Sequence, residues 1–251
     1  ATVQRHARRL LAAVQIGLLS AALAACGSTG EGDPVPEEVT EAPAAPTLIE
    51  RGNRVDLSTR VTVPSPTYGI HAFLWWRPED AERDMLLVKD MGFTWIKQGV
   101  GWRDIEIEKG VFDWGEPAGP DTPGRGLDHI VQKIEEYGGL ELLARVDHQP
   151  AWSRADACSF SGPPDDLNDL ADFLTALASR YRGRIRAYEI WNEPNLAREW
   201  CGEAPDPARY VEMLRVSYQA IKAADPGAIV ISAGLAPTGT EPPQAMPDEA
   251  Y

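Results

Sequence analysis

Residues 188–200 read YEIWNEPNLAREW. They continue a run of β-branched and aromatic residues, IRAYEIW at 185–191, which predicts a short buried strand. The Asn, Glu and Pro that follow at once predict that the chain leaves the strand in a loop. Glu193 therefore stands at the end of a strand, and the rest of the sequence decides whether it has a chemical role or is an ordinary surface glutamate.

Strand-like runs of this kind alternate with amphipathic helical stretches along the chain. The expected strands are 68–73, 93–100, 140–147, 185–191 and 228–234. The expected helices are 79–92, 126–138, 165–183 and 206–227. Their apolar residues recur every three and four positions, and a glycine ends each stretch, which is typical of surface helices. The alternation predicts βα units around a parallel sheet.

The length of the chain fits only part of the corresponding closed barrel. A (β/α)₈ barrel takes about 250 residues, and about 185 residues follow the first expected strand. The sequence therefore predicts an α/β fold, an incomplete (β/α)₈ barrel with about five of its eight βα units, over residues 47–251. We expect a fragment of a longer protein, in which 47–67 form a short hairpin. A five-stranded doubly wound sheet is the structural alternative, although no GxGxxG phosphate loop follows the first strand.

The first 26 residues have the composition of an export signal. RHARR is followed by a 16-residue apolar stretch that is short for a bilayer span, and LAAC ends it at Cys26. This ending resembles the lipobox of bacterial lipoproteins, whose cysteine carries the lipid after cleavage. An ordinary cleaved signal or a membrane anchor is the alternative. Residues 27–46, rich in Pro and Glu, predict a disordered tether, so we expect a lipoprotein exported to the cell surface and anchored to the membrane.

Charge and cysteines exclude some classes of partner. The formal net charge of −14 argues against nucleic acid as a partner, because phosphate binding needs clustered Lys and Arg.

Cys158 and Cys201 fall in loops after expected strands, so in an exported protein we expect a disulfide between them, with two free thiols as the alternative. No CxxC pair or cluster of histidines accompanies them, and we expect neither a metal nor another cofactor.

Aromatic and polar residues gather where the expected strands end. In parallel α/β folds the active site forms at these carboxyl ends. Six of the eight tryptophans lie at or just past them: Trp75, Trp76, Trp102, Trp152, Trp191 and Trp200. The polar residues there include His71, Arg103, Asp147, His148, Asn192, Glu193 and Asn195. Aromatic faces with polar groups beside them suit sugar rings, so the pattern favours a saccharide site over six separate core tryptophans.

Two segments give this pattern a family resemblance. IWNEPN at the fourth expected strand resembles the Asn-Glu-Pro signature of the clan of (β/α)₈ retaining glycoside hydrolases. That clan includes cellulases and mannanases of family 5 and β-xylosidases of family 39. GVGWRDIEIEKGVFDWGEP at 99–117 is similar to the segment that follows the clan's second strand. The resemblance covers roughly residues 66–240, the N-terminal portion of such a barrel.

The resemblance implies roles for individual residues. Glu193 matches the general acid/base, and Asn192 matches the residue that hydrogen-bonds the sugar 2-hydroxyl. A carboxyl group can give and then remove a proton only if its pKa is raised, for which we expect apolar rings and a second carboxylate nearby. The expected substrate-binding residues are Asn192, Trp191, His71, Trp76, Trp102, His148 and Trp152.

The second carboxylate has no match in this chain. The clan's nucleophile is a glutamate on the seventh strand, which we expect beyond residue 251, so that the chain by itself would be inactive. We expect Glu189 to pair with Lys97 or Arg145 inside the barrel. Asp147 is expected to bind substrate or to pair with His148.

Two further matches concern the second strand and its loop. We expect Glu106 to order the loop after that strand. The clan often places an arginine on the second strand, and this sequence has Lys97 in that strand and Arg103 after it.

Three functions are compatible with this pattern. The first is a surface-anchored glycosidase that hydrolyses β-linked poly- or oligosaccharides with retention. The second is a surface lipoprotein that binds carbohydrate without catalysis. The third is an unrelated exported α/β protein with a chance Asn-Glu-Pro.

The lipobox can be tested directly. Mass spectrometry of the exported protein is expected to show diacylglycerol on Cys26 as the first residue, because cleavage precedes the cysteine that receives the lipid. An N-terminus without this modification contradicts the prediction.

Overall fold

The computed structural model describes residues 67–75, 77–119, 124–156, 158 and 161–251. The expected signal peptide, the tether and nearly all of the possible hairpin lie outside the described residues, as does Trp76. None of the helices in the described ranges is long and apolar enough to cross a membrane.

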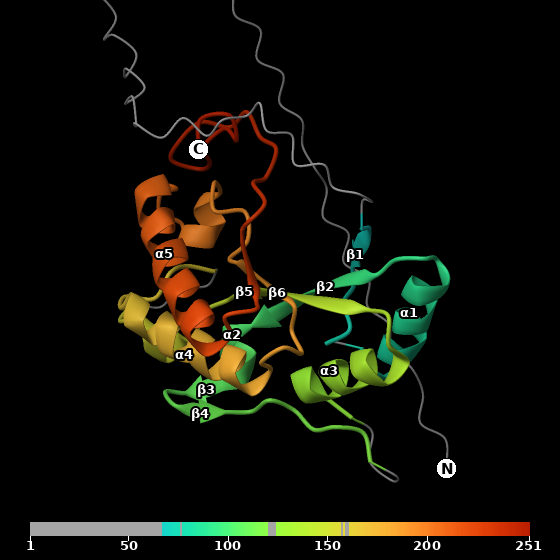
Figure 1. The fold of residues 1–251 in the computed structure, drawn as a ribbon. Helices are drawn as coiled ribbons and strands as arrows, with labels where there is room; N and C mark the ends of the chain where they lie inside the picture. Colours follow the sequence, from blue (N-terminus) through green and yellow to red (C-terminus); the bar gives the residue numbers. More distant parts are fainter. Residues whose placement is uncertain (1–66, 76, 120–123, 157, 159–160) are drawn as a thin grey trace, which may run out of the picture. The chain divides into compact units, whose positions relative to one another are not determined.

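A parallel sheet of five strands runs through the described region (Figure 1). The strands are β1 (Gly69–His71), β2 (Trp95–Gly101), β5 (Glu141–Asp147), β6 (Ala187–Ile190) and β7 (Ile229–Ser232). Each corresponds to one of the five expected strands, and the ends differ by at most two residues. The alternation of apolar runs and helices was therefore sufficient to locate the sheet.

Helices connect these strands as the periodicity predicts. They are α1 (Pro78–Asp90), α3 (Gly126–Tyr137), α4 (Leu167–Arg180) and α5 (Pro207–Ala224). Five short elements were not predicted from the periodicity: α2 (Trp102–Ile105), the hairpin of β3 (Glu106–Glu108) and β4 (Val111–Phe112), and the 3₁₀ turns η1 (Ala151–Ser153) and η2 (Ala197–Trp200). All of these short elements lie in the loops that follow strands.

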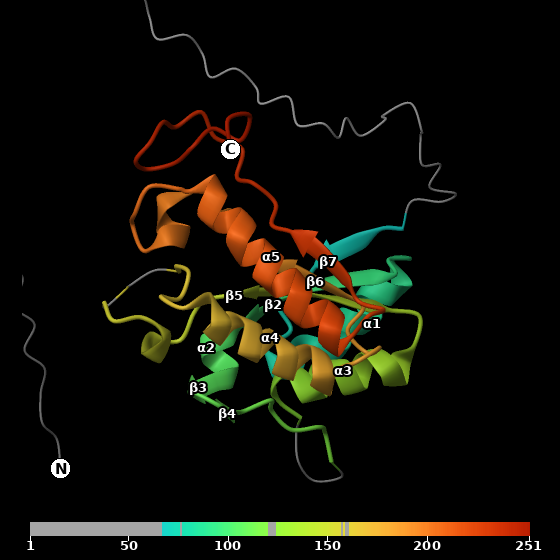
Figure 2. The same ribbon diagram turned by 60° about the vertical axis from the view of Figure 1, so that its left-hand side comes forward.

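The order of the strands identifies the architecture. It is β1-β2-β5-β6-β7, so neighbouring strands of the sheet also follow one another along the chain, and the order never reverses. A doubly wound sheet requires a reversal, and that alternative is therefore wrong. Because parallel crossovers are right-handed, the connecting helices all cover one face. Helix α1 contacts α3, and α4 lies along α5 (Figure 2). The described region is a partial α/β barrel.

Two of the helices, α4 and α5, begin at a capping aspartate. Asp206 accepts hydrogen bonds from the backbone N–H groups of Ala208 and Arg209 at 2.9 and 3.0 Å, and Pro207 is the first residue of α5. Asp166 caps α4 in the same way through the N–H of Asn168. These side chains satisfy donors that have no partner inside a helix, and each contributes about 1 kcal/mol.

The two faces of the sheet differ in polarity because side chains alternate along a strand. Ile96 and Val100 of β2 and Leu142 and Val146 of β5 are buried. The opposite face carries charged groups, including Lys97, which has Leu143 as its register partner on β5. The helices cover the apolar face, so the charged face is the inner face of the barrel.

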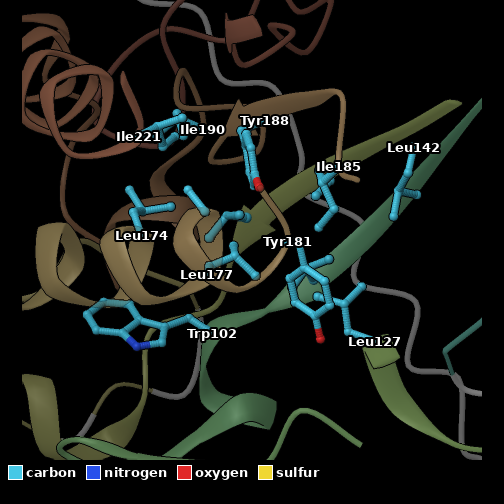
Figure 3. Close-up of a cluster of buried hydrophobic side chains, with 14 of the residues drawn as sticks. Trp102, Leu127, Leu142, Leu174, Leu177, Tyr181, Ile185, Tyr188, Ile190 and Ile221 are labelled. Atoms are coloured by element: carbon cyan, nitrogen blue, oxygen red, sulfur yellow. The ribbon is translucent and has the colours of Figure 1, made fainter. Parts of the chain in front are cut away.

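The main core lies between the sheet and its helices, and it contains Trp102. This side chain has no exposed surface and stacks on Phe173 of α4 with ring centroids 5.5 Å apart. Figure 3 shows it in one cluster with Leu174 and Leu177. The expectation that Trp102 binds substrate is therefore wrong: the large apolar area of the ring is used to anchor the loop after β2 on α4.

Replacing this ring tests its structural role. Trp102→Ala is expected to lower the free energy of unfolding by about 3–5 kcal/mol, because it removes a large buried side chain and leaves a cavity. Chemical denaturation measures the change. The control is Tyr218→Ala on the exposed side of α5, for which we expect a change within about 0.5 kcal/mol. Equal stability of the two variants would contradict the assignment of Trp102 to the core.

Candidate active site

The candidate site lies at the adjacent carboxyl ends of β5 and β6. Val146 pairs with Ile190 in the sheet, so Asp147 and the residues after Ile190 leave neighbouring strands at the same edge. Asn192 and Glu193 are therefore brought beside Asp147 and His148. The fold thus brings together four of the residues that the sequence singled out.

An ion pair occupies the inner face below this edge. Lys97 Nζ lies 2.7 Å from Glu189 Oε1 and 2.6 Å from Oε2, and the glutamate side chain is 7% exposed. This confirms the expected pairing of Glu189. The carboxylate is fully engaged by the lysine, so Glu189 has a structural role.

Arg145 connects the ends of the two strands. Its Nε lies 2.8 Å from Asp147 Oδ2, and its Nη1 donates a hydrogen bond of 3.0 Å to Asn192 Oδ1. The first contact is an ion pair and the second is a hydrogen bond, and a guanidinium group, which is always charged and carries several donors, can make both at once. Asn192 is oriented by a contact that reaches back into the barrel.

The histidines of the site have opposite electrostatic surroundings. His148 Nδ1 lies 2.6 Å from Asp147 Oδ1, and this contact raises the pKa of His148. Asp147 therefore pairs with His148, one of its two expected roles. The pKa of His71 is lowered, mainly because neighbouring groups shield part of its ring from water and further by the charges of Arg145 and Lys97. At neutral pH His71 is expected to be uncharged.

Glu199 belongs to the site and was missed by the sequence analysis. Its side chain is 9% exposed, and its Oε1 accepts a hydrogen bond of 3.1 Å from Asn192 Nδ2. Burial raises the pKa of this carboxyl group. Glu199 lies in the 3₁₀ turn η2, which the periodicity of the sequence does not reveal. The tertiary fold brings its side chain into contact with Asn192.

The Glu193 side chain is half-buried, 31% exposed, and is turned toward Arg198. Arg198 Nη2 contacts Glu193 Oε2. Within the described region, the Glu193 carboxyl group therefore contacts a cation.

The backbone of this edge is unusual. In the described residues, positive φ angles outside glycine occur at His148, Trp191, Glu193 and Cys201, at 58°, 73°, 37° and 58°. Such conformations cost free energy for residues with a side chain and concentrate at functional sites. All four lie at the ends of β5 and β6 or in the loop after β6. The strain marks the same edge as the charged network.

Two of the tryptophans expected at the rim lie beneath it. Trp191 and Trp200 are each 1% exposed. The indole N–H of Trp191 donates to the carbonyl of Glu199, and that of Trp200 donates to the carbonyl of Pro194. The expectation that Trp191 binds substrate is therefore wrong, because its ring packs under the loop that presents Glu193. Burial of these two large rings fixes the shape of that loop.

The remaining aromatic candidates are partly accessible. Trp152 is half-buried, its indole N–H donates to the carbonyl of Glu106 at 3.0 Å, and Lys109 lies over its ring. Trp75 is also half-buried. His71 is exposed and stacks on Phe73 with ring centroids 4.8 Å apart. These rings can still offer a face to a ligand.

Two polar residues near the site have structural tasks. Glu106 accepts hydrogen bonds from Trp102 Nε1 and from the N–H of Gly110, at 2.6 and 2.7 Å, which confirms that it orders its loop. Asn195 is buried and bonds to both the N–H and the C=O of Ala236. It thereby ties the loop after β6 to the segment after β7, and it does not face the site.

A disulfide and a cleft border the site. Cys158 and Cys201 are bonded, with their Cα atoms 5.4 Å apart, so the loop after β5 is joined to the loop after β6. Beside this bond is a cleft of about 440 Å³, a volume typical of small-ligand sites. Arg103 is one of its lining residues, and the Arg103 N–H donates to the carbonyl of His148 at 2.9 Å. The cleft therefore adjoins the candidate site.

No residue is assigned to a metal. Within the described ranges, no group of three or more His, Cys, Asp or Glu side chains could hold a metal ion.

Comparison with known proteins gives relatives of one kind. No protein-family model matches the chain. It is 24% identical over 156 residues to a β-xylosidase of Geobacillus stearothermophilus, an alignment that covers 56% of this chain and 30% of that protein. The chain thus spans about a third of the length of this curated relative.

Solved structures show the same relationship in three dimensions. A family 39 glycoside hydrolase of Bacteroides cellulosilyticus matches with a TM-score of 0.50 and 22% identity, over 66% of this chain and 31% of that one. A β-glycosidase matches with a TM-score of 0.51 and 16% identity, over 66% and 55%. These matches show that the chain has an α/β-barrel fold. This agrees with the family resemblance of its Asn-Glu-Pro segment.

The contrast between the two histidines predicts their titration. In a proton NMR titration, His148 is expected to titrate above 6.5 and His71 below 6.5, the ordinary value of both groups. Asp147→Asn is expected to lower the His148 midpoint, because the charged partner is lost. Since the folded-state pKa of His148 is raised, its contact stabilises the fold fully below pH 6.5 and loses this effect as the pH rises through the folded-state pKa. A His148 midpoint at or below that of His71 would contradict the geometry.

Proposed function

We propose that the complete protein is a glycosidase that hydrolyses β-linked saccharides with retention, and that Glu193 is its general acid/base. The observation that carries the proposal is the placement of Asn192 and Glu193. They leave β6 in a strained turn beside the charged inner face, and Arg145 orients the Asn192 amide. The similarity to glycoside hydrolases supports the same reaction class.

The proposed chemistry requires two proton transfers at one carboxyl group. In the first step Glu193 gives a proton to the glycosidic oxygen, so that the bond to the leaving sugar can break. In the second step it removes a proton from the water that releases the bound sugar. Asn192 would hold the 2-hydroxyl of the sugar through its amide. The carboxylate that attacks the sugar carbon is proposed to come from a strand beyond residue 251, about 5–5.5 Å from Glu193.

Xylosides are the first substrates to test. The curated relative is a β-xylosidase, and this chain shares 24% identity with it over the aligned residues. His71, Trp152 and His148 are proposed to contact the saccharide, because each keeps exposed or half-exposed surface at or near the strand ends. We further propose that the protein is exported and is held at the membrane by lipid on Cys26, with the disulfide in keeping with an oxidising compartment.

One observation favours a second function, carbohydrate binding without hydrolysis. Arg198 contacts the carboxyl group of Glu193, and a cation at this position opposes the protonated form that a general acid needs. If the contact persists when a saccharide is bound, the site would recognise sugars without cleaving them.

A substitution at Glu193 distinguishes the two functions. In the complete protein, Glu193→Ala is expected to lower kcat/KM on aryl β-xylosides with poor leaving groups by about 10²–10⁴-fold, because such groups need a proton donor. On aryl β-xylosides with good leaving groups, which form the intermediate without a proton donor, azide is expected to restore part of the lost kcat, since it attacks the intermediate without needing a base. Activity assays with and without azide measure both effects.

The matched control is Glu203→Ala, an exposed glutamate after the same turn. It is expected to leave activity unchanged. Unaltered rates in Glu193→Ala would remove Glu193 from its proposed role. Saccharide binding by a complete protein that hydrolyses no glycoside would favour the second function.

A further inference from the structure

Glu199 is a buried carboxyl group that the mechanism above does not use. Its Oε1 lies 3.1 Å from Asn192 Nδ2 and 3.5 Å from Arg198 Nε. A buried carboxylate is costly unless hydrogen bonds and opposite charges compensate for the lost water. The two contacts supply this compensation, and both partners are neighbours of Glu193 in the loop.

The first contact fixes the direction of the Asn192 amide. Arg145 can only donate hydrogen bonds, so the carbonyl oxygen of Asn192 must face it. An ionised Glu199 can only accept, so the NH₂ group must face it. Rotating the amide by half a turn would oppose donor to donor and acceptor to acceptor.

The second contact concerns Arg198. This guanidinium lies between two glutamates, with Nη2 on Glu193 and Nε 3.5 Å from Glu199. Its side chain is 59% exposed, so it has room to move. A Glu193 that protonates a glycosidic oxygen must release Arg198, and Glu199 is the other carboxylate within reach of the same guanidinium.

We propose that Glu199 is a positioning residue of this site. It holds the Asn192 amide in one orientation and offers Arg198 a second partner when Glu193 turns to its substrate. The catalytic consequence rests on the proposed function, whereas the coupling of Glu199 to Asn192 and Arg198 does not.

Several charged and polar groups surround the Glu199 carboxyl. They are Asp147 and His148 at the end of β5, Ser161 in the following loop, Asn192 after β6, and Arg198 in η2 itself. Burial raises the pKa of Glu199, and the charge of Asp147 acts in the same direction. Asn192, Arg198 and, to a smaller extent, Ser161 oppose the shift. Removing either Asn192 or Arg198 is expected to raise the pKa further.

The side-chain amide signal of Asn192 reports this coupling without any assay of activity. In the complete protein with ¹⁵N-labelled asparagine, the signal is expected to shift with pH, with a midpoint above 4.5, the ordinary value for glutamate. Glu199→Gln is expected to abolish this step, because the titrating group is gone. Arg198→Gln, a surface change that leaves the buried carboxyl in place, is expected to move the midpoint upward.

The control is Glu203→Gln, which removes an exposed carboxylate after the same turn and is expected to leave the titration unchanged. An Asn192 signal that does not respond to pH overturns the inference. The same holds if the titration step persists unaltered in Glu199→Gln.

Kinetics test the catalytic consequence separately. Glu199→Gln is expected to lower kcat/KM on aryl β-xylosides about tenfold, the effect of one weakened hydrogen bond in the transition state, while Glu203→Gln has no effect. If neither the wild-type protein nor any variant hydrolyses a glycoside, the proposed function is wrong. The amide titration then still tests the coupling of Glu199 to Asn192. If hydrolysis occurs and the amide does not titrate, the role of Glu199 fails and the proposed function stands.

Discussion

The guanidinium group of Arg145 is the contact on which the candidate site depends. From within β5 it holds Asp147 at 2.8 Å and Asn192 at 3.0 Å, and so it joins the end of one strand to the loop of the next. Its side chain is largely buried, which is tolerated because a carboxylate lies beside it. Removing it would leave the buried Asp147 with His148 as its remaining charged partner and the carbonyl oxygen of Asn192 without its donor.

Two series of polar contacts extend from Arg145. One runs through Asp147 to His148, and the other runs through Asn192 to Glu199 and Arg198 and ends at Glu193. The strained backbone of the edge lies along both of them. Such strain persists only where the surrounding structure compensates for it, and the buried rings of Trp191 and Trp200 supply that support from below. The site is therefore held by packing beneath the loop and by charges beside it.

The sequence predicted the five strands of the sheet, the four long helices and the edge at which the site forms, because hydrophobic periodicity and the direction of parallel strands are local properties of the chain. It also predicted that Glu189 pairs with Lys97 or Arg145, of which Lys97 is the partner, and that Glu106 orders its loop. It failed for Trp102 and Trp191, since no local pattern distinguishes a ring that faces a ligand from one that packs under a loop. Glu199 and Arg198 were missed for a related reason. Their contacts depend on the path of an irregular turn, which only the tertiary fold determines.

The central claim is that Asn192 and Glu193 face a bound saccharide. It is tested most directly by a crystal structure of the complete protein with a thio-linked xylose disaccharide, which binds without being cleaved. The account predicts a sugar 2-hydroxyl on the Asn192 amide and the linking sulfur within hydrogen-bond reach of a Glu193 that has left Arg198. A disaccharide bound elsewhere, with Glu193 still against Arg198, would contradict it.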